Sequence, residues 1–315
     1  MRGGIDLGGT KIQAVVIDES DSVAGQARRS TPRDGGPADV ADAIAEALEE
    51  AAGGTPAALT GIGGGSPGTV NEATGTVANA RNLPNWTNPF PLGETLASRF
   101  GVPVRVVNDV GTAVEGEAVL GAGRSFRTFL GLWWGTGVGG AIMVEKHRWL
   151  GRGAAGEIGH MVIKLGGAKC TCGRRGCVEA YAGRAAMERK ARRDQKHGVE
   201  TRLFALMDEH GHDQLTSSVW QHALDEQDAY AEKLIERAIR ALGAGAASAV
   251  NLIDVEAVVV GGGLGTRLGE PGVARIREAM LPHLFVDDRP PEVRLSELGD
   301  LGGAISAARL APVKL

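Results

Sequence analysis

A strand, a tight glycine turn and a second strand occur twice in this chain of 315 residues, and no other feature constrains its fold as strongly. The first copy runs from Ile5 to Asp18 around the turn Gly8-Gly-Thr10, and the second from Thr128 to Val144 around the turn Gly135-Thr-Gly137. We call these the first and the second glycine turn and interpret them as related parts of an internal duplication. Because strands alternate with helices in both halves, we expect an α/β protein of two domains that flank a cleft.

The rest of the chain fits this plan. Residues 38–52 combine helix-favouring residues with apolar side chains at helical spacing, and residues 184–250 are predicted to be mostly helical, with a break at Glu209-His-Gly-His-Asp213. The expected domains are residues 1–121, completed by a C-terminal helix at 302–315, and residues 122–301. Further predicted elements are the strands Leu59–Gly63, Val104–Asp109 and Ala257–Gly263, and the helices Gly111–Leu120 and Gly302–Ala311.

The composition is that of an ordinary globular enzyme, with 43% hydrophobic and 23% charged residues. A net charge of −4 and a pI near 6.0 predict no binding to nucleic acid or to an anionic membrane. No apolar run approaches the roughly 20 residues that a membrane span needs. The N-terminus lacks the apolar core of a signal peptide, and the cysteines have metal-like spacing, so we expect a cytoplasmic protein.

All three cysteines lie in the segment Cys170-x-Cys172-Gly-x-x-Gly-Cys177, shortly after Glu157-Ile-Gly-His160. Three thiols and one imidazole match the four ligands of a closed tetrahedral zinc site. Cys170 and Cys172 are too close in sequence to form a disulfide without strain. Because four protein ligands leave no position for a reacting water, we expect a structural site that immobilises the polar side chains around it.

The first glycine turn combines exposed backbone N–H groups with a hydroxyl, an ammonium and a carboxylate, which suits the oxygens of a phosphate group. The carboxylate can organise Mg²⁺ through water. The second glycine turn would supply donors for the other end of a polyphosphate, although each turn can also be read as a plain hairpin. The candidate residues in the first motif are Asp6, Gly8, Gly9, Thr10 and Lys11.

The 48 glycines gather in short runs that follow or interrupt the predicted strands. Such clusters suggest that several backbone loops approach one ligand closely. The run Gly261-Gly-Gly263 could let an adenine and its ribose lie against the backbone, with Gly262 and Gly263 as the contact residues. The run Gly63–Gly65 continues into the predicted loop Gly64-Gly-Ser-Pro-Gly68.

Asn108 and Asp109 come at the carboxyl end of a predicted strand, where open α/β sheets place ligand-binding groups. An aspartate at this place can accept the proton of a substrate hydroxyl as it attacks a γ-phosphate. Alternatively, Asp109 caps the helix that follows. Asn82, in Ala80-Arg-Asn-Leu-Pro-Asn-Trp86, could bind vicinal hydroxyls, but taken alone it reads as a turn residue.

Together these motifs resemble the ROK group of sugar kinases (repressors, open reading frames and kinases), which has a duplicated actin-like ATPase, or ribonuclease H-like, fold. The strongest piece of the resemblance is Gly156-Glu-x-Gly-His160 with Cys-x-Cys-Gly-x-x-Gly-Cys-x-Glu, which ends at Glu179, and the likeness extends from Ile5 to the last predicted helix. The resemblance implies that Asp109 is the catalytic base and that His160 binds zinc through one ring nitrogen and a sugar hydroxyl through the other.

The resemblance also assigns the other site residues. The implied sugar ligands are Gly68, Asn82, Asn108, Asp109, Glu157, His160 and Glu179; the nucleotide ligands are Asp6, Gly8, Gly9, Thr10, Lys11, Gly135, Thr136, Gly137, Gly262 and Gly263; and the zinc ligands are His160, Cys170, Cys172 and Cys177. The glycine-rich run before Gly68 leaves the backbone donors there open. Trp133 and Trp134 stand before the second glycine turn in place of a smaller residue, and either reshape the phosphate pocket or pack in the core.

These observations predict a sugar kinase with structural Zn²⁺ that uses Mg²⁺ with ATP to phosphorylate a hexose, with glucose expected first. An N-acetylhexosamine kinase is the main alternative within the family, and inorganic polyphosphate remains open as a donor. A sugar-responsive repressor is less expected, because only Met1 to Gly4 precede the first predicted strand and the net charge is negative. An actin-like ATPase without a sugar site would not need Glu157, His160 and the cysteines. The family implies a homodimer or a dimer of dimers.

Overall fold

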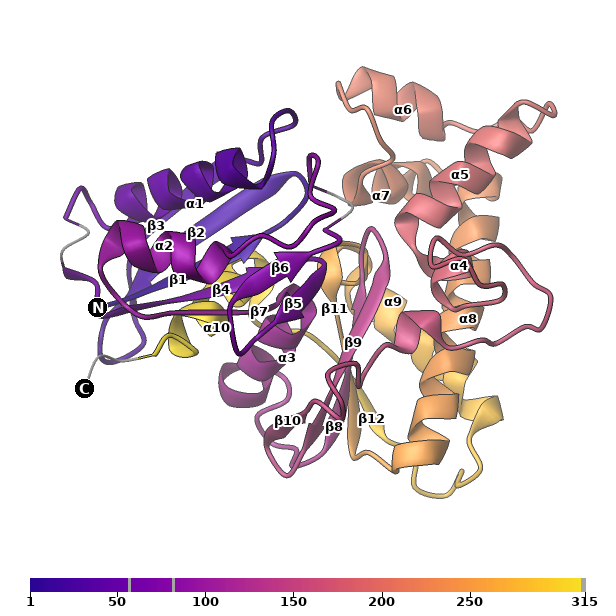
Figure 1. Ribbon diagram of the computed structural model, residues 1–315. Helices are drawn as coiled ribbons and strands as arrows, with labels where there is room; N and C mark the ends of the chain where they lie inside the picture. Colours follow the sequence, from indigo (N-terminus) through magenta and orange to yellow (C-terminus); the bar gives the residue numbers. More distant parts are fainter. Residues whose placement is uncertain (56–57, 81–82, 313–315) are drawn as a thin grey trace. The chain divides into compact units, whose positions relative to one another are not determined.

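The computed structural model describes residues 1–55, 58–80 and 83–312. The chain forms two compact units (Figure 1), and we describe each by itself: unit 1 comprises residues 1–121 and 297–315, and unit 2 comprises residues 122–296.

Unit 1 is built on a five-stranded sheet with the strand order β3-β2-β1-β4-β7. The first three strands form an antiparallel meander, whereas β4 and β7 join β1 in parallel. The strands are β1 (Arg2–Leu7), β2 (Lys11–Ile17), β3 (Val23–Ser30), β4 (Gly61–Ser66) and β7 (Val104–Asn108), with a separate hairpin of β5 (Thr69–Asn71) and β6 (Thr76–Ala78). The helices are α1 (Pro37–Ala51), α2 (Leu92–Phe100), α3 (Asp109–Leu120) and α10 (Gly302–Arg309).

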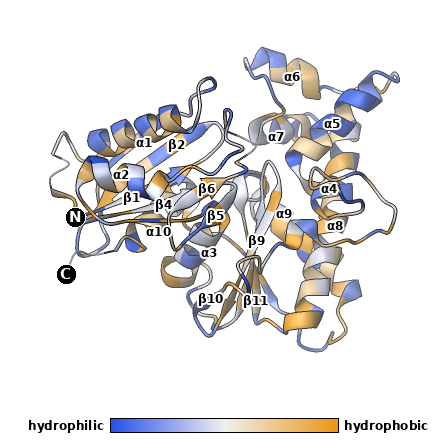
Figure 2. Ribbon diagram, viewed as in Figure 1, coloured by the Kyte–Doolittle hydropathy of each residue, from blue (hydrophilic) through white to orange (hydrophobic). Residues whose placement is uncertain are grey.

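Helix α1 confirms the periodicity of residues 38–52. It begins with Pro37 at its first position and is supported by the Asp39 carboxylate, which accepts from the Gly36 N–H at 2.7 Å. Its apolar side, including Ile44 and Leu48, is fully buried in the core of unit 1, and its other side is hydrophilic (Figure 2). This one-sided pattern is what anchors a helix on a sheet.

Strand β4 was predicted to end at Gly63, but it extends to Ser66 because Gly64 and Gly65 pair with both β1 and β7, and Ser66 pairs with β7. A Cβ atom on Gly63 would overlap the backbone carbonyl of Ala307 in α10, and one on Gly4 of β1 would overlap that of Ala304. Gly4 and Gly63 are register partners, so the two strands present one smooth face to the helix. The expectation that Gly63–Gly65 approach a ligand is therefore wrong for Gly63, which approaches a helix.

Unit 2 repeats the plan with the strand order β10-β9-β8-β11-β12. Again the first three strands are antiparallel neighbours and the last two join in parallel, so the predicted duplication is confirmed. Its strands are β8 (Phe129–Trp134), β9 (Val138–Val144), β10 (His147–Trp149), β11 (Ala257–Gly261) and β12 (Glu292–Leu295). Its helices are α4 (Glu179–Ala182), α5 (Arg184–Gln195), α6 (Leu203–Glu209), α7 (Ser217–Asp225), α8 (Ala229–Ile253) and α9 (Gly262–Met280).

The two tryptophans before the second glycine turn face different surroundings. Trp134 is fully buried in the main core of unit 2, and its indole N–H donates to the Ala182 carbonyl at 2.7 Å. Trp133 is half-buried, and its ring lies against Gly261, where a Cβ atom would come within 2.8 Å of it. Of the two interpretations, core packing therefore holds for Trp134.

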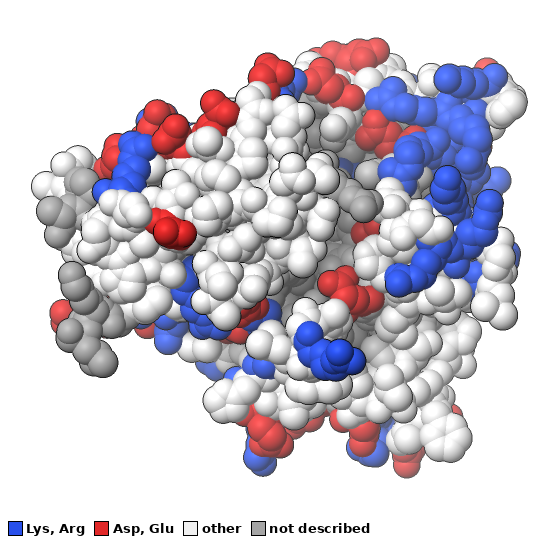
Figure 3. Space-filling model, in the orientation of Figure 1, with Lys and Arg blue, Asp and Glu red and all other residues white. Residues whose placement is uncertain are grey.

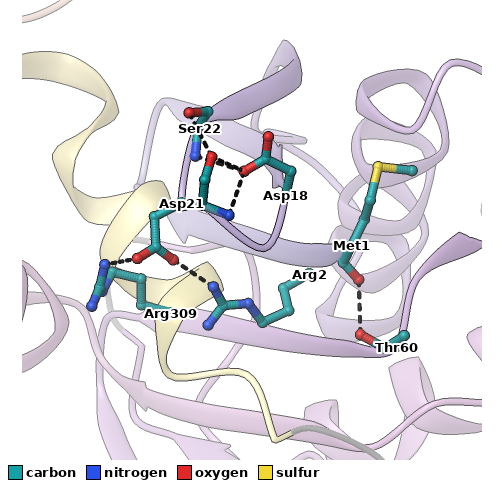
Figure 4. Close-up of polar contacts among 8 residues, drawn as sticks. Met1, Arg2, Asp18, Asp21, Ser22, Thr60 and Arg309 are labelled. Carbon is teal, nitrogen blue, oxygen red and sulfur yellow. Dashed lines mark hydrogen bonds and ion pairs between the residues drawn. The ribbon is translucent and has the colours of Figure 1, made fainter.

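The last helix of unit 1 is fastened to the start of the chain by charged groups (Figure 4). The Asp21 carboxylate receives one guanidinium from Arg2 of β1 and another from Arg309 of α10. Asp21 lies in the left-handed region, with φ at 65°, in a turn where the Asp18 carboxylate accepts from the Ser22 N–H at 3.0 Å. A rigid turn thus presents one carboxylate to both arginines.

A buried carboxylate marks where the chain returns to unit 1. Glu117 in α3 is only 2% exposed, and its two oxygens accept from the backbone N–H groups of Glu297 at 3.1 Å and Leu298 at 3.0 Å. These contacts precede α10, so unit 1 begins again at Glu297, ahead of the predicted Gly302. Buried backbone donors need such partners.

We expect Glu117→Ala to lower the free energy of unfolding by about 2–5 kcal/mol, because two buried N–H groups would lose their acceptors. Glu117→Gln should cost less, since its amide oxygen can still accept one of the two bonds. Chemical denaturation measures the difference. The control is Glu94→Ala, an exposed acid in the first turn of α2, for which we expect a change within about 0.5 kcal/mol. A Glu117→Ala protein as stable as this control would contradict the role of the carboxylate.

Candidate functional site

The residues predicted from the sequence fall in both units. In unit 1, the first glycine turn joins β1 to β2 and is closed by the Gly8 N–H, which donates to the Lys11 carbonyl at 2.8 Å. Thr31, which the sequence did not single out, holds this turn from outside. Its hydroxyl donates to the Gly8 carbonyl at 2.7 Å, and its backbone N–H donates to the Thr10 carbonyl at 3.2 Å. In a trans peptide the N–H points opposite to the C=O, so the Gly9 N–H points away from Thr31.

Asp6 stands at the end of β1 beside the first turn of α10. A Cβ atom on Gly303 would lie 2.8 Å from an Asp6 carboxylate oxygen, so a larger residue at that position would displace this carboxylate. The amino-terminal end of a helix favours a negative charge, which suits a carboxylate at this place. The helix at the end of the chain therefore helps to position a group from its beginning.

Asn108 and Asp109 lie where β7 passes into α3. Asn108 is the helix cap, because its side-chain oxygen accepts from the N–H groups of Val110 at 3.1 Å and Gly111 at 3.3 Å. Asp109 is the first helical residue and is half-buried; one of its oxygens accepts from the Val110 N–H at 2.9 Å. The alternative of Asp109 as the cap is therefore wrong, since its neighbour fills that role. The Asn108 side chain thus uses its oxygen for the cap, and its NH2 group is the end that can donate a hydrogen bond.

Of the two other sugar ligands predicted in unit 1, the structure describes one. Gly68 has φ at +92°, and a Cβ atom there would lie 2.6 Å from the Ala78 carbonyl, so the backbone bend after β4 requires glycine. Asn82 lies outside the described residues.

In unit 2, the four predicted metal ligands converge. One ligand atom each from His160, Cys170, Cys172 and Cys177 lies within 4.8 Å of all the others. The Cys170 sulfur is 3.8 Å from His160 Nδ1, and the sulfurs of Cys172 and Cys177 are 3.7 Å apart. Such separations fit four ligands around one ion better than a disulfide, and three thiols with one imidazole suit a soft or borderline metal.

The thiols are held in unequal surroundings. Burial raises the pKa of Cys177 to about 12 and also raises the pKa of Cys170, whereas a hydrogen bond from the Arg174 backbone lowers the pKa of Cys172. Buried thiols of this kind need a cation to become thiolates, which is the chemical role that a bound metal would fill.

The second nitrogen of His160 points to the other side of the cluster. Its Nε2 lies 4.0 Å from a carboxylate oxygen of Glu157, while Nδ1 faces Cys170. Glu157 is exposed, so this end of the imidazole and the carboxylate form a polar pair at the surface of unit 2. A metal on Nδ1 would fix the tautomer, and therefore the hydrogen-bonding state of Nε2.

Glu179, at the start of α4, connects the cysteine segment to the second glycine turn. One carboxylate oxygen accepts from the Thr171 hydroxyl at 3.0 Å and lies 3.8 Å from the Cys170 sulfur. The other accepts from the Val138 N–H at 3.1 Å, immediately after the turn. Glu179 thus has a structural task besides its predicted sugar contact.

The second glycine turn is closed by the Gly135 N–H, which donates to the Gly137 carbonyl at 3.0 Å. The start of α5 holds it from outside, and the side chain of Arg184 donates to the Thr136 hydroxyl at 2.9 Å. Sequence reasoning missed Arg184, because a single cation at the start of a helix carries no signal by itself.

The third glycine run passes from β11 into α9. Gly262 has φ at +83°, and a Cβ atom there would lie 2.8 Å from the backbone of Trp134, so packing of the sheet requires this glycine. Gly263 also lies beside the second glycine turn, since a Cβ atom on Gly135 would lie 3.8 Å from its nitrogen. The structure therefore brings the third glycine run beside the second glycine turn, and the predicted contacts of Gly262 and Gly263 with the nucleotide stay predictions.

Although the net charge is −4, positive charge is concentrated in one region of the surface (Figure 3). Figure 3 shows Lys and Arg side chains gathered over the region of α5. In the described part of the chain, no helix is long and apolar enough to cross a membrane. The basic residues of α5 are Arg184, Arg189, Lys190, Arg192 and Arg193.

Comparison with known proteins agrees with this geometry. The model of the ROK family matches residues 2–314. A glucokinase of Thermotoga maritima is 32% identical over 98% of this chain and 96% of its own length, and an N-acetylmannosamine kinase of Yersinia pseudotuberculosis is 33% identical over 96% and 97%. A solved ROK family glucokinase from Streptomyces griseus, in complex with glucose and AMPPNP, superposes with a TM-score of 0.84 at 32% identity, covering 98% of both chains. The predicted duplicated actin-like fold is thereby confirmed, and the chain belongs to the ROK family.

Proposed function

We propose that this protein is a sugar kinase that transfers the γ-phosphoryl group of Mg·ATP to a hexose hydroxyl, with O6 of glucose as the expected acceptor. One observation carries most weight: the imidazole of His160 has one nitrogen on the cysteine cluster and the other beside Glu157. An ATPase of the same fold without a sugar substrate has no need for an imidazole fixed in this way. The full-length similarity to glucokinases supports the same choice.

In this proposal, Asp109 accepts the proton of the attacking hydroxyl, since a carboxylate at the first position of α3 is half-buried and held by the Val110 N–H. The two glycine turns bind the phosphates through backbone N–H groups, and Asp6 organises Mg²⁺ through water. Mg²⁺ neutralises charge that develops on the phosphoryl oxygens. The proposed sugar ligands are Gly68, Asn82, Asn108, Asp109, Glu157, His160 and Glu179.

For the cysteine cluster we propose Zn²⁺, bound by His160 and the three thiolates. Four protein ligands saturate a tetrahedral ion, so its role is to hold the imidazole, the cysteine segment and, through Glu179, the second glycine turn. No step of the phosphoryl transfer passes through this ion.

A second candidate within the family is an N-acetylhexosamine kinase. It is favoured by the N-acetylmannosamine kinase of Yersinia pseudotuberculosis, which is about as similar to this chain as the glucokinase is. Glucose remains the first expectation, because carboxylates and an imidazole pair directly with unsubstituted hydroxyls. An N-acetyl group at C2 needs additional space and a partner for its amide.

A coupled assay over glucose, mannose, N-acetylglucosamine and N-acetylmannosamine tests this choice, with ATP and polyphosphate each supplied as donor. We expect glucose to have the highest kcat/KM, mannose a lower one, and both N-acetylhexosamines to be poor substrates. Sugars that lack a paired hydroxyl should lose up to about 10⁴-fold, because the polar groups of the site then go unpaired. A higher kcat/KM for either N-acetylhexosamine would replace glucokinase by the second candidate and leave the kinase proposal standing.

Replacing the base should separate chemistry from binding. Asp109→Asn keeps the side-chain oxygen that accepts from the Val110 N–H but loses basicity, so we expect kcat to fall by roughly 10²–10⁴. Glucose affinity, measured by calorimetry, should change far less. The control is Asp39→Asn, the same substitution in the first turn of α1, which should leave kcat unchanged. Near-normal turnover of Asp109→Asn would place the base elsewhere.

Removing one thiolate should affect folding and activity together. The purified protein is expected to hold one zinc per chain, and Cys172→Ser should lower both the metal content and the melting temperature, because binding energy at a structural site is folding energy. Lys169→Ala, in the same segment but outside the ligand set, should retain the metal. Metal analysis that finds no stoichiometric zinc in the unmodified protein would disprove this assignment.

A further inference from the structure

The side chain of Arg184 lies at the first position of α5 between two hydroxyl groups. Its two terminal nitrogens donate to the Ser217 hydroxyl oxygen and to the Thr136 hydroxyl oxygen, each at 2.9 Å. The charge of Glu188 acts on Arg184, but the oxygens of Glu188 accept from Arg192 and from the Leu215 N–H. The guanidinium is therefore held by neutral partners.

Burial lowers the pKa of Arg184, although a guanidinium remains protonated at any physiological pH. A half-buried cation whose contacts are neutral is incompletely compensated in charge. Both hydroxyl oxygens use a lone pair to accept from Arg184, so their own protons must be donated elsewhere. Such hydroxyl groups are oriented as donors, which is what an anion requires.

The backbone at the start of α5 orients the second glycine turn in the same sense. The N–H groups of Arg184 and Ala185 donate to the carbonyls of Gly135 at 3.1 Å and Thr136 at 3.0 Å. In a trans peptide the N–H points opposite to the C=O, and the described chain has no cis peptide. The N–H groups of Thr136 and Gly137 therefore both point away from α5, as a pair of donors on the opposite side of the turn.

We propose that Arg184 is a positioning residue for the phosphoryl donor, which orients the Thr136 and Ser217 hydroxyls and the second glycine turn toward the phosphoanhydride oxygens. This inference rests on the proposed kinase function and adds two residues to its site, Arg184 from α5 and Ser217 from α7. Ser217 belongs to the same place, because a Cβ atom on Gly263 would lie 3.4 Å from its hydroxyl oxygen. The positive charge of Arg184 adds a long-range attraction for a polyanion.

The competing explanation is that Arg184 only joins α5 to α7. The two roles differ in which measurement responds. A structural link lowers stability and affects both substrates alike, whereas a donor-positioning residue changes donor affinity and spares the sugar. A matched structural arginine is available in Arg202, which joins the start of α6 to Glu226 after α7 at 2.9 Å.

The experiment compares Arg184→Met, Arg184→Lys, Ser217→Ala and Arg202→Met. For each we would measure the KM of ATP and of glucose, the melting temperature, and calorimetric Kd values for Mg·ADP, tripolyphosphate and adenosine without sugar. We expect Arg184→Met to raise the KM of ATP and the Kd of Mg·ADP about 10- to 100-fold, the size of one lost charge-assisted contact, while the KM of glucose stays within about twofold. Arg184→Lys should recover part of this loss, and Ser217→Ala should show a smaller one.

The calorimetric measurements show which part of the phosphoryl donor Arg184 affects. Tripolyphosphate should lose affinity in Arg184→Met by the same factor as Mg·ADP, and adenosine should not, because the contact is with the phosphate chain. Arg202→Met should lower the melting temperature without changing the ratio of the two KM values. Equal changes in both KM values of Arg184→Met, or a loss of Mg·ADP affinity no larger than in Arg202→Met, would overturn the inference. Failure of the unmodified protein to phosphorylate any hexose would refute the proposed function, while the calorimetry would still decide the role of Arg184.

Discussion

The close packing of α10 on the sheet of unit 1 is the contact on which the geometry of that unit depends. Gly4 and Gly63 have no side chains, so the helix backbone approaches the strands directly, and Gly303 then reaches the Asp6 carboxylate. A larger residue in place of Gly4 or Gly63 would push α10 outward and move Gly303 away from the Asp6 carboxylate. At the far end of the same helix, Arg309 binds the Asp21 carboxylate, which also binds Arg2 of β1. Packing at the end of the chain thus determines the surroundings of a carboxylate near its beginning.

In unit 2, the local geometry depends in a similar way on one side chain, that of Glu179. Its carboxylate accepts from Thr171 in the cysteine segment and from Val138 after the second glycine turn, so the proposed metal site and the proposed phosphate site share one side chain. A charge-assisted hydrogen bond of this kind is stronger than a neutral one. In the proposed function, a metal that orders the cysteine segment would therefore support the second glycine turn through Glu179, without taking part in phosphoryl transfer.

The parts of the fold that could be predicted from the sequence are those that leave a local pattern of residues. The two strand–turn–strand units, the helix over 38–52 and the cluster of four candidate metal ligands were recognisable because apolar periodicity and ligand spacing are local properties. Strand β3 was not predicted, because most of its residues are exposed and its sequence shows no regular apolar alternation, and its place depends on pairing with β2. The extension of β4 beyond Gly63 was missed for a related reason: Gly64 and Gly65 look like a loop, and their place in the sheet depends on pairing with β1 and β7.

The candidate site shows the same division between local and tertiary information. The glycine turns themselves could be predicted, but the groups that hold them could not, because each lies far away along the chain or carries no motif. The first turn is held by the hydroxyl and N–H of Thr31, whereas the second is held by the start of α5 and by the side chain of Arg184. The two halves of the duplication thus share the turn and differ in its support. Thr31 supports the first turn through a neutral hydroxyl, and Arg184 supports the second through a guanidinium. Because the strands of both halves follow the same order, this difference comes from the elements around the turns and not from the strands that form them.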